Sequence, residues 1–296
     1  MKLLIVGGGR MGEALLGGLI AAGREPGELG VAEVAAARRE ELAQAHPGVT
    51  IVETPVAADG VLLAVKPVDV AQTARAAGEA GCARVLSVAA GITTAVIEAA
   101  LPHPLPVVRA MPNTPALIGA GAAAISPGTH AGEADLAWAE EILGAVGVVV
   151  RVPEGSLDAV TGLSGSGPAY VFLVAEAMAD AGVLAGLPRD VAETLAFQTL
   201  LGSARLLAEG DQGPAAAITA SRNAARTPAR SSSRRPAAVV PPGEVTAAFS
   251  AAGPSSLSES SFAEPSRVWK ASVSAMTRGR PASTPASAIA SATRKT

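Results

Sequence analysis

The sequence has 296 residues, which is enough for two domains that each bury a core. Apolar residues make up 49% of the chain and aromatic residues only 2%, so the core must be built from Ala, Val, Leu and Ile. The single cysteine, Cys82, excludes an internal disulfide and suits a reducing cytosol. No uninterrupted apolar stretch is long enough to span a bilayer, so we expect a soluble, cytoplasmic protein with no membrane partner.

Charge is unevenly distributed along the chain. Residues 1–212 carry 12 Lys and Arg against 23 Asp and Glu, a net charge of −11, whereas residues 213–296 carry 11 against 3, a net charge of +8. The second stretch is dominated by Ala, Ser, Pro and Arg, a composition that buries too little apolar surface to offset backbone entropy. We therefore expect residues 213–296 to be a disordered low-complexity tail. Its arginines are not interleaved with aromatic residues, so nucleic acid is not an expected partner.

Strand and helix signals alternate through residues 1–153. The first unit is a strand at Leu3–Val6, a glycine-rich turn and an apolar helix. Further helices are expected at Ala36–Ala45, Val68–Glu79 and Glu133–Leu143, and further strands at Leu29–Glu33, Val49–Val52, Val61–Val65, Arg84–Val88, Val107–Ala110, Gly121–Ile125 and Val148–Val150. Because the strands are near-continuous apolar runs, this region is predicted to be an open, doubly wound α/β domain whose parallel sheet is covered on both faces.

The pattern changes to helical from Asp158 onward. Apolar residues recur at helical spacing through Ala169–Ala181 and Arg189–Glu209, on either side of a Gly182–Pro188 turn. Pro188 stands where a helix is expected to begin. We therefore predict a second, α-helical domain at residues 154–212.

The turn after the first strand has the spacing Gly7-x-Gly9-x-x-Gly12, with Arg10 and Met11 before the last glycine. The first glycine permits a tight turn, the second lets the backbone approach a pyrophosphate, and the third lets helix and strand pack closely. The helix N-terminus then faces the anion with free N–H groups. A glycine-rich turn without a ligand is the alternative. The placement of this glycine-rich turn between a strand and a helix favours a dinucleotide site built from Gly7, Gly9, Arg10, Met11 and Gly12.

Glu33 ends the second strand about twenty residues beyond Gly12, where an acidic side chain can accept hydrogen bonds from both ribose hydroxyls of NADH. The carboxylate of Glu33 would repel the 2′-phosphate of NADPH unless an arginine neutralised that phosphate. Arg38 and Arg39 fall on the following helix. The alternative is a solvated residue at a strand end. NADPH or NADH is therefore the expected cofactor, with Glu33 favouring NADH.

Three further strand ends carry candidate cofactor residues, because cofactors lie at this edge of such sheets. Ala64, Val65, Lys66 and Pro67 follow the fourth strand; Lys66 can meet phosphate or ribose oxygens, or be solvated. The small residues of Ser87–Gly91, among them Ala89 and Gly91, allow a nicotinamide ring close to the backbone. In the loop Met111–Pro115, two prolines hold Asn113, which offers both a donor and an acceptor; a rigid polar turn without function is the alternative.

The helical region opens with Ser164-Gly165-Ser166-Gly167-Pro168. Serine hydroxyls and bare backbone N–H groups ahead of a proline-started helix suit a small carboxylate, so Ser164 to Gly167 are the candidate substrate-binding residues. Helix capping by Ser166 is the alternative. We assign no metal ligand and no catalytic acid or base.

Together these segments resemble the pyrroline-5-carboxylate reductase family over about residues 1–210. The most specific segment is Asp158–Tyr170, followed by Glu176, Asp180–Val183 and Gly186–Pro188. The resemblance implies a Rossmann-like NAD(P)-binding domain joined to a helical dimerisation domain, and hence a homo-oligomer. It also implies hydride transfer from the nicotinamide to the C=N carbon of 1-pyrroline-5-carboxylate, which gives L-proline in the last step of proline biosynthesis.

The sequence departs from this family after residue 210. Members carry a Ser-Pro-Gly-Gly-Thr-Thr loop there that binds the substrate carboxylate across the dimer, and no such run follows Gly210 here. Residues 213–296 also have the composition that a shifted reading frame in a GC-rich gene would give. The chain is thus either a working reductase or a catalytically impaired remnant that still binds cofactor. A related reductase of another substrate is a third possibility, against which Asp158–Tyr170 argues.

Overall fold

The computed structural model describes residues 1–210 and 213–219 of the chain. The tail expected at residues 213–296 therefore lies outside the described residues, except for 213–219. Within that short stretch, residues 214–219 are helical. All the described residues fall in one compact unit.

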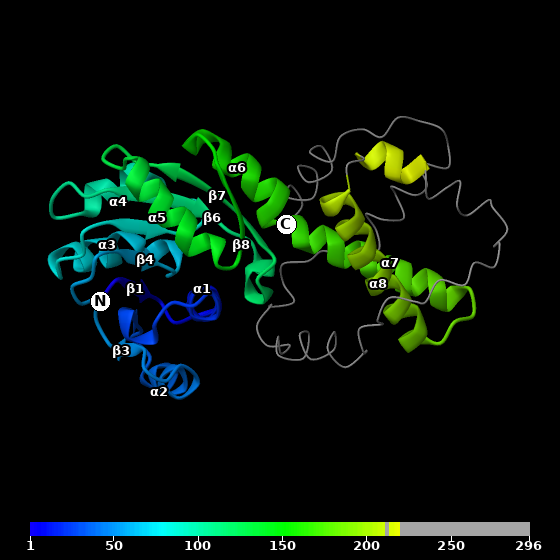
Figure 1. Cartoon of the computed structure of the whole chain (residues 1–296), viewed down its shortest axis with the longest axis horizontal. Coiled ribbons are helices and arrows are strands. Elements are labelled where there is room, and N and C mark those ends of the chain that lie inside the picture. The colour runs from blue at the N-terminus through cyan, green and yellow to red at the C-terminus, as the bar shows by residue number, and fades with distance from the viewer. Residues whose placement is uncertain (211–212, 220–296) are drawn as a thin grey trace, which may run out of the picture. The chain divides into compact units, whose positions relative to one another are not determined.

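Eight strands form a single sheet in the order β3-β2-β1-β4-β5-β6-β7-β8 (Figure 1). The order from β3 to β6 is that of a doubly wound nucleotide-binding domain, and the direction of strand addition reverses between β1 and β4. The loops after β1 and β4 therefore flank the crevice where ligands bind in such sheets. The strands are β1 (Leu3–Val6), β2 (Leu29–Ala32), β3 (Thr50–Val52), β4 (Val61–Leu63), β5 (Val85–Ser87), β6 (Val107–Met111), β7 (Gly121–Pro127) and β8 (Gly147–Arg151).

The expectation of a parallel sheet is confirmed for β1 to β6 and is wrong for the step to β7. β7 runs antiparallel to β6, with Met111 opposite Ala124, and β8 then runs parallel to β7. Only residues 112–120, which include the 3-10 helix η3 (Thr114–Ile118), connect β6 to β7. A connection this short cannot make the crossover that a parallel pair needs.

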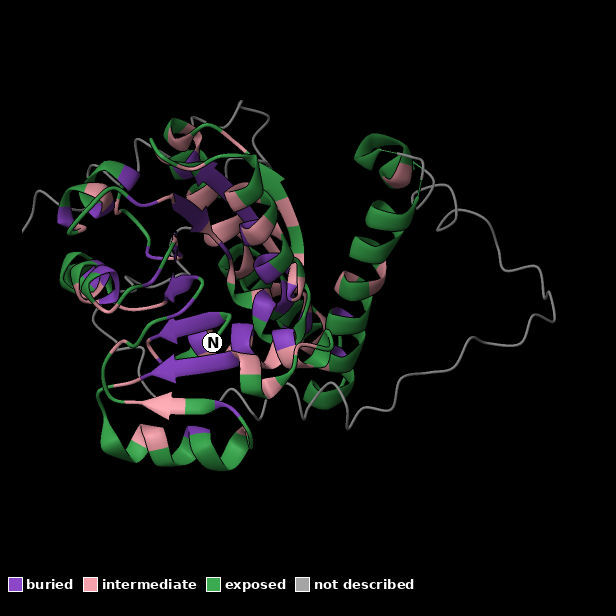
Figure 2. Ribbon diagram, turned by 60° about the vertical axis from the view of Figure 1, so that its left-hand side comes forward, coloured by how far each residue is buried: buried purple, intermediate pink, exposed green. Residues whose placement is uncertain are grey.

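Side chains of each central strand alternate between two cores, one on each face of the sheet. In β1, Leu3 and Ile5 join the core under α1, α2 and α5, whereas Leu4 and Val6 join the core under α3 and α4. These strands are purple along their length in Figure 2, which marks full burial. The covering helices are α1 (Arg10–Ala21), α2 (Ala36–Ala45), α3 (Val70–Glu79), α4 (Thr94–Ala100) and α5 (Glu133–Gly144). Of these, α4 was not among the expected helices, because seven residues show little periodicity.

The helical region has the two long helices that the sequence predicts. Short turns lead into them: η4 (Glu154–Ser156), α6 (Leu157–Val160) and a π-helical turn, η5 (Thr161–Gly165). The long helices are α7 (Gly167–Leu184) and α8 (Arg189–Glu209). Their buried residues are all alanines: Ala175 and Ala179 in α7, and Ala192 and Ala196 in α8.

Large apolar side chains of α7 are exposed, in contrast to those of the central strands β1, β2, β4 and β5. Tyr170 is 59% exposed and Phe172 55%, and their neighbours Val171, Leu173 and Val174 are exposed as well. Among the described residues, one segment, Glu154–Leu184, is long and apolar enough to cross a membrane by length and composition alone. The sequence predicts that no apolar stretch is long enough to span a bilayer. That prediction did not consider helical structure that continues through α6, η5 and α7.

Candidate cofactor and substrate site

The turn between β1 and α1 requires glycine at two of its three fingerprint positions. Gly7 has a φ of +101°, and a Cβ there would lie 2.6 Å from the carbonyl oxygen of Ala64. A Cβ on Gly12 would clash with the carbonyl oxygen of Gly7. A Cβ on Gly9, the N-cap of α1, would have no atom within 4 Å. The first and third glycines thus serve packing, while the second borders the open space where a pyrophosphate would lie.

The carboxylate of Glu33 is fixed beside this turn. Its Oε2 accepts a hydrogen bond from the backbone N–H of Gly8 at 2.8 Å, and its Oε1 accepts one from Ala35 at 2.9 Å. These bonds hold an acidic group next to the β1–α1 turn, where a carboxylate that binds a ribose is expected.

Both arginines of α2 are already occupied by carboxylates and backbone carbonyls. Arg38 donates from Nε to the carbonyl oxygen of Gly8 at 2.8 Å and forms ion pairs with Glu13 and Glu41. The hydrogen bond with Glu41, supported by Glu13, raises the pKa of Arg38 although its burial acts in the opposite direction. Arg39 donates to the carbonyl oxygens of Glu33 and Val34, and pairs with Glu53 at 3.2 Å. A 2′-phosphate would have to displace one of these carboxylates.

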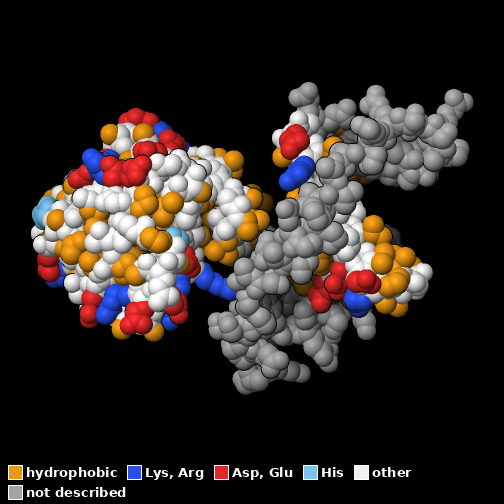
Figure 3. Space-filling model, turned by 60° about the horizontal axis from the view of Figure 1, so that its bottom comes forward, with side chains coloured by type: hydrophobic (Ala, Val, Ile, Leu, Met, Phe, Trp, Pro, Cys, Tyr) orange, Lys and Arg blue, Asp and Glu red, His pale blue; other side chains and the backbone are white. Residues whose placement is uncertain are grey.

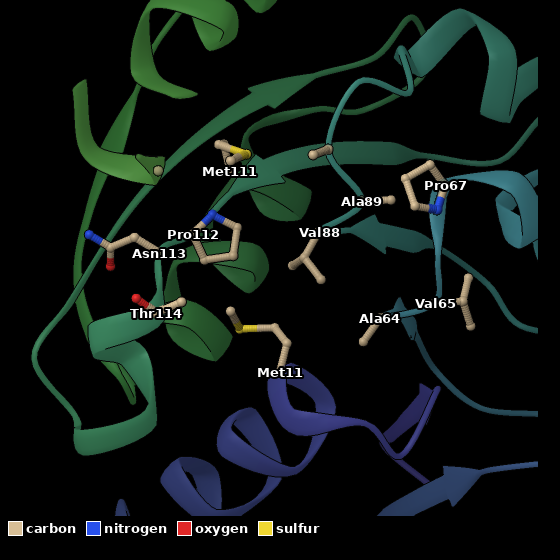
Figure 4. Close-up of a pocket in the computed structure, with 12 residues that line it drawn as sticks. Met11, Ala64, Val65, Pro67, Val88, Ala89, Met111, Pro112, Asn113 and Thr114 are labelled. Atoms are coloured by element: carbon tan, nitrogen blue, oxygen red, sulfur yellow. The ribbon is translucent and has the colours of Figure 1, made fainter. Parts of the chain in front are cut away.

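A cavity of about 310 Å³ opens at the carboxyl ends of β4, β5 and β6 (Figure 4). Met11 of α1 points into it from one side and Val88 from the loop after β5. None of the lining residues carries a side chain that titrates near neutral pH, so the cavity suits an uncharged ring. The lining consists of Met11, Ala64, Val65, Pro67, Val88, Ala89, Ala90, Met111, Pro112, Asn113, Thr114 and Gly165.

The predicted site residues divide between this cavity and its surroundings. Those that line the cavity are Met11, Ala64, Val65, Pro67, Ala89, Asn113 and Gly165. Of the others, Gly7, Gly9, Arg10 and Gly12 lie at the β1–α1 turn, and the carboxylate of Glu33 lies beside it. Lys66 and Gly91 are exposed close by in sequence, and Ser164, Ser166 and Gly167 flank the lining residue Gly165. Met111, Pro112 and Thr114, which we did not assign individually, complete the wall formed by the loop after β6.

Asn113 connects the cavity to the helical region. Its Nδ2 donates to the carbonyl oxygen of Ser164 at 3.1 Å, and its Oδ1 accepts from the backbone N–H of Ala122 at 2.9 Å. A Cβ on Gly165 would lie 2.7 Å from Cε of Met111, so this glycine allows the π-helical turn to lie against the cavity wall. One candidate substrate-binding residue therefore reaches the same cavity as the candidate cofactor residues.

A cluster made by the buried residues Arg109 and Thr94 and the half-buried Glu154 was not predicted from the sequence. Glu154 accepts hydrogen bonds from the backbone N–H and hydroxyl of Thr94, at 2.7 and 2.8 Å, and pairs with Arg109 at 3.2 Å. Burial alone would raise the pKa of Glu154, but these hydrogen bonds from Thr94 and Arg109 outweigh it, and the pKa is lowered. An arginine inside the apolar strand Val107–Met111 was the available signal, because a buried guanidinium needs a partner.

Two family models match the chain. A model described as pyrroline-5-carboxylate reductase dimerisation matches residues 154–228, and one described as NADP oxidoreductase, coenzyme F420-dependent, matches residues 2–91. The first spans α6, α7 and α8, and the second spans the glycine turn through Gly91.

Whole proteins with these features are similar to this chain over most of its length. A pyrroline-5-carboxylate reductase of Mycobacterium tuberculosis is 44% identical over 261 residues, which cover 83% of this chain and 87% of that protein. One of Synechocystis is 46% identical over 220 residues, covering 73% and 82%. The solved structure of a pyrroline-5-carboxylate reductase from Coxiella burnetii matches with a TM-score of 0.70 and 28% identity, covering 94% of this chain and 95% of that one. Site geometry, family models and relatives agree: the chain belongs to the pyrroline-5-carboxylate reductase family.

Proposed function

We propose that this chain binds NADH or NADPH along the β1–α1 turn and reduces 1-pyrroline-5-carboxylate to L-proline in the cavity at the ends of β4, β5 and β6. The observation that carries the proposal is the meeting of two sets of residues. The cofactor candidates Ala64, Ala89 and Asn113 share one cavity with Gly165 of the substrate candidates. A nicotinamide and a small ring placed together there would be in position for hydride transfer.

For the cofactor, we propose that Gly7 to Gly12 hold the diphosphate and that Glu33 binds the adenosine ribose. Arg10 and Lys66 form no ion pair with any residue that the structure describes, so both cations are available to phosphate oxygens. Glu33, Arg38 and Arg39 as arranged favour the free ribose diol of NADH over the 2′-phosphate of NADPH.

For the substrate, we propose that Ser164, Gly165, Ser166 and Gly167 receive the carboxylate at the start of α7. Backbone N–H groups at a helix N-terminus attract anions. A nicotinamide bound in the cavity would supply the hydride that the C=N carbon takes up, and the ring nitrogen would keep its proton in the amine product. Because no lining side chain can act as an acid near neutral pH, the substrate is expected to enter as the protonated imine.

The exposed apolar face of α7 supports assembly with a second copy of the chain. A helix that is apolar all round is normally buried. Since Glu154–Leu184 lies within the match to the dimerisation model, a subunit interface accounts for its apolar surface without a membrane. Localisation in the cytoplasm stays a prediction.

A second candidate function rests on the missing Ser-Pro-Gly-Gly-Thr-Thr run. We predict that NADH binding survives and that turnover is severely reduced, because the substrate carboxylate loses the ligands from that loop. NADH fluorescence titration followed by an assay with 1-pyrroline-5-carboxylate on the same sample tests both points, with the Mycobacterium tuberculosis relative as the parallel standard. Turnover equal to that standard would refute the impairment, and failure to bind either nucleotide would refute the proposed function itself.

A further inference from the structure

The segment that carries the proposed substrate-binding residues is attached to β6 and its loop at two points. At its start, Arg109 of β6 pairs with Glu154, whose carboxylate also accepts two hydrogen bonds from Thr94. At its end, Asn113, in the loop after β6, donates to the carbonyl oxygen of Ser164. The loop with Asn113 also lines the proposed nicotinamide cavity. One strand thus holds both the cavity wall and the substrate segment.

Burial makes the first attachment rigid. The side chain of Arg109 is 6% exposed, and that of Glu154 is 29% exposed. A buried guanidinium that loses its carboxylate is strongly destabilised, so Glu154 is constrained to this place. Leu157, three residues further, is fully buried and fixes the beginning of α6.

The second attachment is needed because the segment between is irregular. Thr161–Gly165 forms a π-helical turn, in which Ser166 donates to the carbonyl oxygen of Thr161. Such turns are less regular than α-helix and cluster at functional sites. The bond from Asn113 to Ser164, together with the close approach of Gly165 to Met111, defines how far the turn stands from the cavity.

We propose that Asn113 and the Arg109–Glu154 ion pair are positioning residues that hold the Ser164–Gly167 turn at a fixed distance from the nicotinamide cavity. This inference rests on the proposed function for its catalytic consequence. Asn113 then acts through Ser164 rather than mainly as a cofactor ligand. Displacement by about 1 Å can cost roughly 100-fold in rate, so loss of either attachment should slow hydride transfer without weakening dinucleotide binding.

Asn113→Asp and Glu154→Gln, in the full chain, test the proposal at neutral pH. An aspartate at 113 keeps an acceptor for the N–H of Ala122 but turns a carboxylate oxygen toward the carbonyl of Ser164. Glu154→Gln keeps the side-chain shape and removes the negative charge that pairs with Arg109. Glu98→Gln is the matched control, because Glu98 holds the N–H and hydroxyl of Thr129 at 2.5 and 2.8 Å in the same manner.

Three measurements on each variant decide the matter: the NADH dissociation constant, kcat and KM for 1-pyrroline-5-carboxylate, and amide hydrogen exchange of residues 161–167. We expect faster exchange in both test variants, with kcat/KM for the imine lowered about 10- to 100-fold and NADH affinity within about twofold of wild type. Glu98→Gln should match wild type in all three.

Unchanged exchange in both test variants would overturn the proposal, as would a parallel loss of NADH affinity in Asn113→Asp, which would make that residue a direct cofactor ligand. If Glu154→Gln does not fold, Asn113→Asp decides alone. If the proposed function is wrong, the wild-type chain will not reduce the imine. In that case the hydrogen-exchange data still decide whether the two attachments hold the turn.

Discussion

Gly9 and Gly17 both have open space around them, but only Gly9 is expected to contact a bound dinucleotide. An added Cβ would meet no atom within 4 Å at either glycine, but Gly9 lies at the β1–α1 turn, where we propose that the pyrophosphate binds, and Gly17 lies inside α1. Gly9→Ala is therefore expected to fold with wild-type stability and to weaken NADH binding at least about tenfold, because the methyl group occupies the path of the pyrophosphate. Fluorescence titration and thermal unfolding of the same sample measure both effects.

Gly17→Ala is the matched control for that substitution. An alanine in a helix interior is favoured over glycine by about 0.5–1 kcal/mol, so this variant should unfold at a slightly higher temperature and bind NADH normally. Equal NADH affinity in both variants would contradict the placement of the diphosphate at Gly9.

Glu33 sets the cofactor preference that we expect. Glu33→Ser removes the charge that repels a 2′-phosphate and leaves a hydroxyl, so the ratio of NADPH to NADH affinity should rise about tenfold. Dissociation constants for both nucleotides provide the measurement. Glu25→Gln, which removes one exposed charge away from the turn, should leave the ratio unchanged; a wild-type chain that already prefers NADPH would refute the role of Glu33.

How far single residues could be predicted depends on the sequence separation of their partners. The glycine turn lies within six consecutive residues, so its spacing and its placement between a strand and a helix were enough to predict a dinucleotide site. Arg109 and Glu154 are 45 residues apart, and Asn113 and Ser164 are 51 apart. No local pattern encodes such pairs, since the fold alone brings them together. Asn113 was therefore predicted to be part of the site, but its bond to Ser164 was not.

At the scale of elements, strand periodicity predicted the positions of the strands better than their direction. Val107–Ala110 and Gly121–Ile125 were both expected as strands, and β6 and β7 contain them. An apolar run has the same pattern whichever way the strand runs. Only the length of the connection therefore distinguishes a crossover to a parallel strand from a reversal to an antiparallel one. The nine residues 112–120 between them were the available evidence.

Acid should destabilise the first turn of the helical region, because it protonates Glu154. Because its pKa in the folded protein is lowered below the ordinary 4.5, this carboxylate stabilises the fold above about pH 4.5, and the contribution is lost as pH falls through the folded-state pKa. The difference in melting temperature between wild type and Glu154→Gln should therefore be largest near neutral pH and shrink as the pH falls below 4.5. Thermal unfolding across that range measures it, and a difference independent of pH would contradict the assignment.

At the scale of the whole molecule, the exposed side chains of α7 predict self-association. Five consecutive apolar residues, 170–174, are exposed in a single copy, and Figure 3 shows hydrophobic side chains on the described surface. Phe172→Arg should place a charge in the interface and shift the mass in solution toward the 29.1 kDa of one chain. Light scattering after size-exclusion chromatography measures the shift.

The control for that variant is Glu176→Gln, an exposed change on the same helix that removes a charge instead of adding one. It should keep the wild-type mass. A wild-type chain that is already monomeric at micromolar concentration would show that the apolar face of α7 has no partner of its own kind.

The seam between α7 and α8 has an energetic consequence. Alanine methyl groups and Gly182, where an added Cβ would lie 2.9 Å from Cβ of Ala192, allow the two helices a close approach but remove little hydrocarbon from water. Such a hairpin gains most of its cohesion from whatever covers its outer surface. If a second copy covers this surface, as we propose, folding and assembly of the region are coupled, and dilution should weaken its structure.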